Sequence, residues 1–234
     1  MDTLNTKITY VVLVHFNELP MQKLAANQNV EKFSKAFGFR QAEVRQDNTR
    51  NLVGFLFRSG LFNSSDGGQV AIKRLELEDR KLIIEMEGNS DQAAEFYSYL
   101  VSNFADLAER THENFLEPIL VAFESEIIAH LFFPVTNLLS QDYLQFIQTE
   151  AVEKIGSEYG NVRIIPATIA FDVDVLVKDT YLSDHRIALT RKEFSVQPAV
   201  GHPIEEQIYI SKAPVDTQTH VKLLEHLEAA MSRK

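Results

Sequence analysis

Two aspartates and a histidine are the residues of this chain best suited to chemistry. Asp172 and Asp174 alternate with apolar residues and therefore share one face of a predicted strand, and Asp184 and His185 follow after a short turn. If the next strand folds back on the first, Asp172, Asp174 and His185 come together. Two carboxylates and an imidazole would suit a divalent cation that activates water. The alternative is an ordinary solvated strand face beside a turn histidine.

The remaining histidines and the glycine-containing turn carry no recognised motif. His15 and His130 lie in apolar runs, which predicts hydrogen-bonded core or interface residues, and His202 lies in the loop 197–204, where an ordinary turn and a functional loop are both open. The turn 63–68 matches neither glycine pattern that binds phosphate. No serine stands in a Gly-x-Ser-x-Gly elbow. These absences favour a protein that is not an enzyme, without cofactors other than a divalent metal at Asp172, Asp174 and His185.

The strand that carries the two aspartates must position them. The segment 162–178 is the most apolar and β-branched run of the chain, so we expect the other elements to assemble around it. Pro166 predicts an edge position or a bulge in its first part, because proline cannot donate a backbone hydrogen bond to a neighbouring strand.

Composition limits the function classes. The chain has 234 residues, of which 45% are hydrophobic and 24% are charged, as in ordinary globular proteins. It has no cysteine, which excludes disulfides and thiolate chemistry, and its net charge of −10 disfavours nucleic acid and anionic lipid as partners. The N-terminal segment lacks the basic region of a secretion signal, and no apolar run reaches the roughly 20 residues of a membrane helix. We expect a cytoplasmic protein without a membrane partner.

Hydrophobic spacing predicts the same element order twice. The longest helix is predicted from a capping Ser90 to about Thr111, with an apolar stripe that should lie on a sheet and with Glu95 on the wet face. A second helix is predicted to be capped by Ser140. The predicted strands are 9–16, 40–46, 52–57, 70–77, 81–86, 119–133, 162–178, 185–196 and 207–211, and further helices are predicted near 29–38 and from 216 or 217 onward.

Each half of the chain therefore reads as strand, helix, several antiparallel strands and helix. The pattern predicts an α+β fold of two β-α-β(3–4)-α units, residues 1–115 and 116–234, that arose by internal duplication. The units could form one broad, curved and mostly antiparallel sheet with helices on one face, as a continuous domain, or two separate lobes.

Short motifs add a family resemblance. The segment 170–175, the pair Asp184-His185 and the segment 191–194 resemble the C-terminal half of a sporadically distributed, uncharacterised bacterial family of duplicated α+β architecture. Segment 57–59 and the turn at Asp66-Gly67 resemble its first half, whereas its Arg-Ile-Gly-Leu-Arg-Tyr-type segment appears only as 162–164. No activity is assigned to that family, so the resemblance implies no catalytic role. The unit order is also similar to the TATA-binding-protein-like saddle, which is a likeness of architecture alone.

These observations predict a non-catalytic protein-binding or assembly module, with a sheet face or edge as its interface. Phenylalanines are abundant in the predicted strands, and a surplus beyond the needs of one core would indicate a protein partner or a homo-oligomer. One alternative is a metal-dependent hydrolase that uses Asp172, Asp174 and His185. Another is nucleic-acid binding on the concave sheet, against which the net charge argues.

Overall fold

The computed structural model describes residues 1–15, 18–47, 52–108, 117–147, 149, 168–173 and 192–232. They form an α+β protein with a large antiparallel sheet, as the sequence predicts. The chain divides into two compact units. Unit 1 comprises Met1–Asn5, Glu126–Pro214 and Gln218–Lys234, and unit 2 comprises Thr6–Ser125 and Val215–Thr217.

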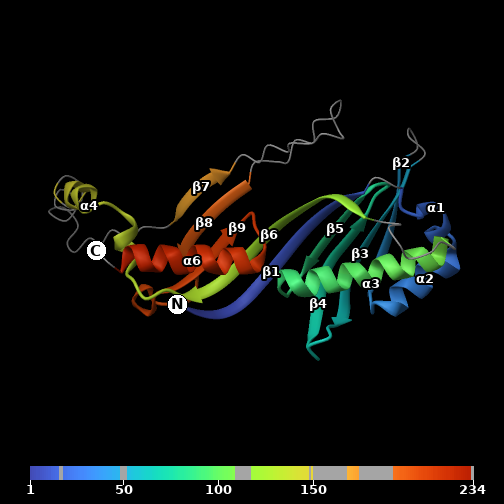
Figure 1. Cartoon of the computed structure of the whole chain (residues 1–234), viewed down its shortest axis with the longest axis horizontal. Coiled ribbons are helices and arrows are strands. Elements are labelled where there is room, and N and C mark those ends of the chain that lie inside the picture. The colour runs from blue at the N-terminus through green and yellow to red at the C-terminus, as the bar shows by residue number, and fades with distance from the viewer. Residues whose placement is uncertain are drawn as a thin grey trace. The chain divides into compact units, whose positions relative to one another are not determined.

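Nine strands make up the described sheet, and Figure 1 labels them. In unit 2 their order is β2-β3-β4-β5-β1-β6, and in unit 1 it is β1-β6-β9-β8-β7, because β1 and β6 contribute residues to both units. Every strand pair with a defined register is antiparallel. The strands are β1 (Asp2–His15), β2 (Gln41–Asp47), β3 (Leu52–Asn63), β4 (Gln69–Leu77), β5 (Lys81–Met86), β6 (Pro118–His130), β7 (Ile169–Val173), β8 (Lys192–Pro198) and β9 (Ile208–Ala213).

The described helices alternate with groups of strands along the chain. The α-helices are α1 (Met21–Leu24), α2 (Asn27–Ala36), α3 (Ser90–Ala108), α4 (Gln141–Ile147) and α6 (Thr217–Met231), and two 3-10 turns are η1 (Val135–Leu138) and η3 (Ile204–Glu206). Within the described residues, no helix combines the length and apolar character needed to cross a bilayer.

Unit 2 has an aromatic core between α2, α3 and one face of its strands. Phe33 of α2 lies 4.9 Å from Phe57 of β3 and 5.7 Å from Phe104 of α3, measured between ring centroids. Val11 and Leu13 of β1 are buried in the same cluster. Leu100 and Phe104, which belong to the apolar stripe predicted for α3, are fully buried, and so is Phe96, which was not predicted as part of that stripe.

A bulge in β4 keeps this core continuous. The register between β4 and β5 shifts between Ile72 and Arg74, whereas β3 stays in register with β4, because Arg58 pairs with Arg74 and Gly60 with Ile72. Ser59 of β3, between those two pairs, has a φ of 56°, in the left-handed region. The buried phenylalanines of β3 are Phe55 and Phe57 before Ser59 and Phe62 after it, so a strict alternation could not predict all of β3.

The start of α3 differs from the prediction. Asn89, rather than Ser90, caps the helix, because its Oδ1 accepts a hydrogen bond from the N–H of Gln92 at 2.9 Å while Oε1 of Gln92 accepts one from the N–H of Asn89 at 3.0 Å. Ser90 instead exchanges hydrogen bonds with Thr217, the first residue of α6. The N–H of Thr217 donates to Oγ of Ser90 at 2.6 Å, and the N–H of Ser90 donates to Oγ1 of Thr217 at 3.1 Å.

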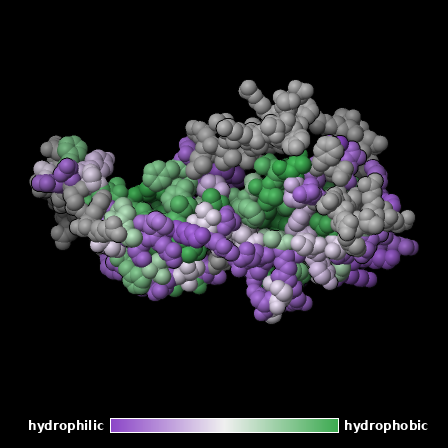
Figure 2. Space-filling model, in the orientation of Figure 1, coloured by the Kyte–Doolittle hydropathy of each residue, from purple (hydrophilic) through white to green (hydrophobic). Residues whose placement is uncertain are grey.

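Unit 1 is built around a smaller cluster that includes Ile127, Val196, Tyr209 and Leu224. In it the prediction for segment 162–178 is wrong for the described part. Among the described strands β7 stands last in the order, and its Phe171 is 59% exposed; apolar side chains lie at the surface in this region (Figure 2). A long apolar run therefore does not identify the strand around which the sheet is built. Pro166, which predicted an edge position or a bulge, lies outside the described residues.

Candidate functional site

Of the predicted metal ligands, only Asp172 lies in the described part of the chain. It is exposed on β7 and stands opposite Glu193 of β8, whereas Phe171, beside it, stands opposite Phe194. The predicted alternation is therefore present, with Asp172 and Phe171 on opposite faces. Asp174, Asp184 and His185 lie outside the described residues. Among those that are described, no group of three or more histidine, aspartate or glutamate side chains is placed to hold a metal ion.

His15 is a buried core histidine, as predicted. Its Nε2 shares a hydrogen bond with the hydroxyl of Tyr97 on α3 at 2.7 Å, and the two rings stack with centroids 5.8 Å apart. Burial lowers the pKa of His15 and raises the pKa of Tyr97. Both side chains are therefore neutral near pH 7, with His15 buried and Tyr97 half-buried.

A second buried histidine, His220 on α6, was missed by the sequence reading. Its Nε2 lies 2.8 Å from Oγ of Ser211 on β9, and that hydroxyl donates to the carbonyl of Ser195 at 2.8 Å. Burial lowers the pKa of His220 to about 4. A serine beside a histidine resembles part of a hydrolytic site, but both side chains are buried, so no substrate reaches them.

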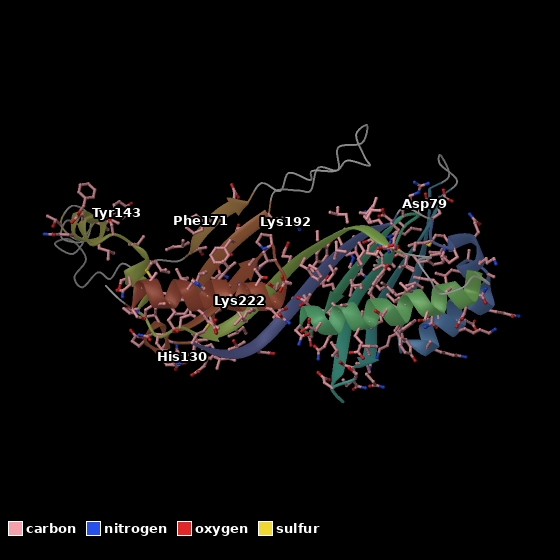
Figure 3. The ribbon with its side chains drawn as sticks, in the orientation of Figure 1. Asp79, His130, Tyr143, Phe171, Lys192 and Lys222 are labelled. Carbon is pink, nitrogen blue, oxygen red and sulfur yellow. The ribbon has the colours of Figure 1, made fainter. Side chains whose placement is uncertain are left out.

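The two other histidines singled out by the sequence lie near the surface. His130, labelled in Figure 3, is half-buried at the end of β6, with its ring 4.4 Å from that of Phe132. His202 is exposed, and its Nδ1 lies 2.9 Å from Oε2 of Glu206. This contact within one loop fits the ordinary turn that was one of the two interpretations.

Glu76 on β4 is the most buried carboxylate whose ion pairs are defined. Its Oε1 accepts a hydrogen bond from Arg45 of β2 at 2.9 Å, and its Oε2 is paired with Arg74. Because both oxygens are engaged by guanidinium groups, Glu76 joins β2 to β4 and is not available as a general base.

The β3–β4 turn is held by carboxylates rather than shaped for phosphate. Glu95 of α3 accepts hydrogen bonds from Oγ of Ser64 and from the N–H of Ser65, both at 2.8 Å. Asp66 accepts one from the N–H of Gly68 at 2.8 Å, which is the main reason why its pKa is lowered. The backbone donors that could hold an anion thus face the protein's own carboxylates. Glu95, which was expected on the wet face of α3, anchors this turn.

The described feature best suited to binding is the second face of the unit 2 sheet. Even-numbered residues of β1 point to the side opposite the core, so Val12 and Val14 lie there, half-buried. Val12 stands opposite Ile83 of β5, and Ile83 stands opposite Glu76 of β4. The helices of unit 2 contribute their buried residues to the core on the other face. We call half-buried Tyr10, Val12 and Val14, together with Ile83, which is buried at 7% exposed, the second face.

Comparison with known proteins adds no relative to this description. A scan against protein-family models finds no match, and a search of curated proteins finds none either.

Proposed function

We propose that this chain is a non-catalytic protein-binding or assembly module whose interface is the second face. The observation that carries the proposal is the two-sided apolar character of β1. Val11 and Leu13 are buried in the core, and Val12 and Val14 repeat the same chemistry on the opposite side. Strands that are apolar on both faces are typical of sheets covered on both sides, and the core of unit 2 accounts for one side only.

The proposal includes an internal duplication, which repeated hydrogen bonds support. The hydroxyl of Thr9 donates to the carbonyl of Gly88 at 2.6 Å, and the hydroxyl of Ser125 donates to the carbonyl of Val215 at 3.0 Å. Gly88 and Val215 each stand two residues before the first residue of a helix, α3 and α6. The same bond between a central strand and a helix entrance thus occurs once in each half of the sequence.

A second contact repeats at the same spacing. The N–H of His15 donates to the carbonyl of Arg80 at 2.8 Å, and the N–H of Leu131 donates to the carbonyl of Gln207 at 3.1 Å. His15 follows Thr9 by six residues, as Leu131 follows Ser125. Ser90 and Thr217 each donate a backbone N–H to the hydroxyl oxygen of the other. Such a reciprocal pair of hydrogen bonds is expected between two equivalent positions.

This correspondence argues against a catalytic role for the buried His15–Tyr97 pair. Leu131 takes the place of His15, and Leu224, seven residues after Thr217 as Tyr97 is seven after Ser90, takes the place of Tyr97. Both leucines are fully buried. A polar pair in one half therefore corresponds to an apolar pair in the other, as expected when the pair serves packing.

The Ser211–His220 pair, in the second half, likewise corresponds to apolar residues in the first half. Counting from the same helix starts, Ser211 corresponds to Ile84 and His220 corresponds to Ala93, and both counterparts are buried apolar residues.

The alternative of a metal-dependent hydrolase would rest on Asp172, Asp174 and His185, and no observation on the described residues favours it.

A matched pair of variants tests the interface. Val12→Thr with Val14→Thr keeps β-branched side chains in the strand but makes the second face polar. Val44→Thr changes an exposed valine on β2 and serves as the control. We expect light scattering after size exclusion to show a concentration-dependent assembly that the double variant weakens at least about tenfold and the control leaves unchanged.

If the wild-type chain is a monomer at all concentrations, the homo-oligomer form of the proposal is wrong. The partner form then requires that immobilised wild-type protein retain a cellular protein that the double variant loses and the Val44→Thr control keeps. Equal retention by all three proteins would contradict the interface.

A further inference from the structure

β2 stands at one end of the described strand order and offers an open edge. Among the described strands, β3 alone lies beside it, and the two strands pair from Gln41–Arg58 to Asp47–Leu52 without a break in register. Residues 41–45, whose side chains the structure describes, are all exposed. An edge strand presents backbone N–H and C=O groups that another strand can bind.

The usual protections of an edge strand are missing from β2. Protected edges are very short, twisted by a bulge, interrupted by proline or lined with lysine. β2 has seven residues in unbroken register with β3 and contains no proline. Its charged residues, Glu43, Arg45 and Asp47, are of both signs. Such an edge repels a strand of unmatched charge but attracts one in which each charge meets its opposite.

Two copies of β2 match each other in one register. A two-fold axis perpendicular to the sheet pairs two antiparallel copies about one central residue. With Val44, the middle residue of β2, at the centre, Glu43 of each copy stands opposite Arg45 of the other, and Gln41 stands opposite Asp47. A centre at Glu43 or Arg45 instead places two like charges directly opposite, which destabilises a strand pair. The charge order therefore favours the register that also pairs the whole strand.

Arg45 is already oriented at this edge. Its Nη1 donates to Oε1 of buried Glu76 at 2.9 Å, and its Nε lies 3.8 Å from Oε1 of Glu43. A guanidinium has five N–H donors, and the Arg45 side chain is 47% exposed, so donors remain for a carboxylate across the edge. Because the ion pair with Glu76 orients the guanidinium, less rotamer freedom is lost when that carboxylate binds. Val44 is 55% exposed, so pairing two copies also removes an apolar side chain from water.

We propose that two copies of this chain join through β2, in an antiparallel pair centred on Val44, so that the sheet of unit 2 continues from one copy into the other. Two Glu43–Arg45 ion pairs fix the register, and the backbone groups of the two edges supply the hydrogen bonds. The interface is isologous, so it closes with two copies. The two-fold axis also brings the second faces of both copies to one side of the joined sheet. The pairing does not depend on the second face being an interface.

Reversing one charge tests the register in the full chain. Glu43→Lys turns both ion pairs of the dimer into repulsions, whereas Glu225→Lys makes the same change of net charge at an exposed position of unit 1. We expect light scattering over a concentration series to show a wild-type dimer whose dissociation constant rises at least about tenfold in Glu43→Lys and stays unchanged in Glu225→Lys. Thermal melts of the two variants check that both fold.

Mixing two variants gives a rescue that this register predicts. Arg45→Glu also places like charges opposite each other, but a copy with Arg45→Glu restores both ion pairs when it meets a copy with Glu43→Lys. Native mass spectrometry of the mixture should therefore show a mixed dimer in excess over either self-dimer. Arg74 still pairs with Glu76 when Arg45 is replaced. If Arg45→Glu nevertheless unfolds, the comparison of Glu43→Lys with Glu225→Lys decides alone.

Three results would each overturn the pairing: a wild-type chain that stays monomeric at all concentrations, equal dissociation constants for Glu43→Lys and the wild type, or folded variants that form no mixed dimer. The second face gives a different pattern. Val12→Thr with Val14→Thr should keep the β2 dimer and lose only assembly beyond it, and Val44→Thr should keep both, because it leaves a β-branched residue on the axis. Binding of a cellular partner to the second face would survive the loss of β2 pairing.

Discussion

At the residue scale, each buried histidine depends on a hydrogen-bond partner, and removing that partner should lower the free energy of unfolding. Tyr97→Phe removes the hydroxyl but keeps the ring, so Nε2 of His15 loses its partner inside the core. We expect the free energy of unfolding to fall by about 1 to 3 kcal/mol, the cost of an unsatisfied buried polar group. Adding His15→Leu, the residue found at the corresponding position 131, should recover most of that loss. Urea melts of the two single variants and the double variant form the cycle that checks this.

His220 should make the protein sensitive to acid. Its pKa is about 4 in the folded protein and near 6.5 in the unfolded chain, so between these values the unfolded state binds more protons. Stability is therefore complete above pH 6.5 and falls as the pH drops toward 4, by roughly 3 kcal/mol at most from this group. His15, whose pKa is also lowered, acts in the same direction. His220→Gln should flatten the fall in urea midpoint over this range, and an unchanged slope would show that another group controls it.

The candidate sites show what residue patterns can and cannot reveal. The burial of His15 could be predicted because it sits in an apolar run, but its partner Tyr97 lies 82 positions away and only the fold brings it close. His220 lies on the helix predicted from 216 or 217 onward, but a polar residue gives no sign in the sequence that it points into the core. The spacing of Asp172 and Asp174 suggested a site for a divalent cation, but spacing within one strand does not show which residues lie opposite that face.

At the element scale, α3 provides the clearest test of the architecture. Phe104 is fully buried, and Phe104→Ala should lower the free energy of unfolding by roughly 3 to 5 kcal/mol. Glu95→Ala should cost about 1 kcal/mol, because it releases the hydrogen bonds of Ser64 and Ser65, so this exposed-looking position is not neutral. Urea melts give both values. A neutral Phe104→Ala would mean that α3 packs through another face.

The packing around β3 predicts a contrast between two glycines of this strand. A Cβ on Gly60 would lie 2.5 Å from the ring of Phe39 and 3.0 Å from the carbonyl oxygen of Phe37, whereas a Cβ on Gly54 would meet nothing closer than 3.4 Å. Gly60→Ala should therefore destabilise the protein by about 1 to 3 kcal/mol, and Gly54→Ala should change it far less. Thermal melts of the two variants decide this, and equal effects would argue against close packing at Phe39.

Element types were easier to predict than element positions. The hairpin of β4 and β5 and the existence of α3 follow from alternation and helical spacing, which are local properties. The order of strands in a sheet is not local. We expected the other elements to assemble around the segment 162–178, but its described part stands last in the strand order, while β1 pairs with β5. Capping was also local but ambiguous, since Asn89 and Ser90 are both good cap residues and only the bond to Gln92 distinguishes them.

At the scale of the whole molecule, the proposed function makes a negative prediction about metals. A site that bound Mg²⁺, Mn²⁺ or Zn²⁺ in the native state would raise the melting temperature as the ion is added. We expect a change of less than about 1 °C at millimolar concentration for each ion, a shift of a few tenths of a kcal/mol. A clear rise that Asp172→Asn abolishes would revive the hydrolase alternative and would direct attention to Asp174 and His185.

The pairing of β1 with β5 has a consequence for how the chain is made. Val11 pairs with Ile84, so the first strand emerges from the ribosome 73 residues before its partner. At about 5 to 20 residues per second, that interval lasts roughly 4 to 15 s, during which a strand that is apolar on both faces has no neighbour. Such a segment is prone to pair with other nascent chains until β5 arrives. The most hazardous moment for this protein therefore falls during its synthesis, when rare codons between β1 and β5 would lengthen the exposure.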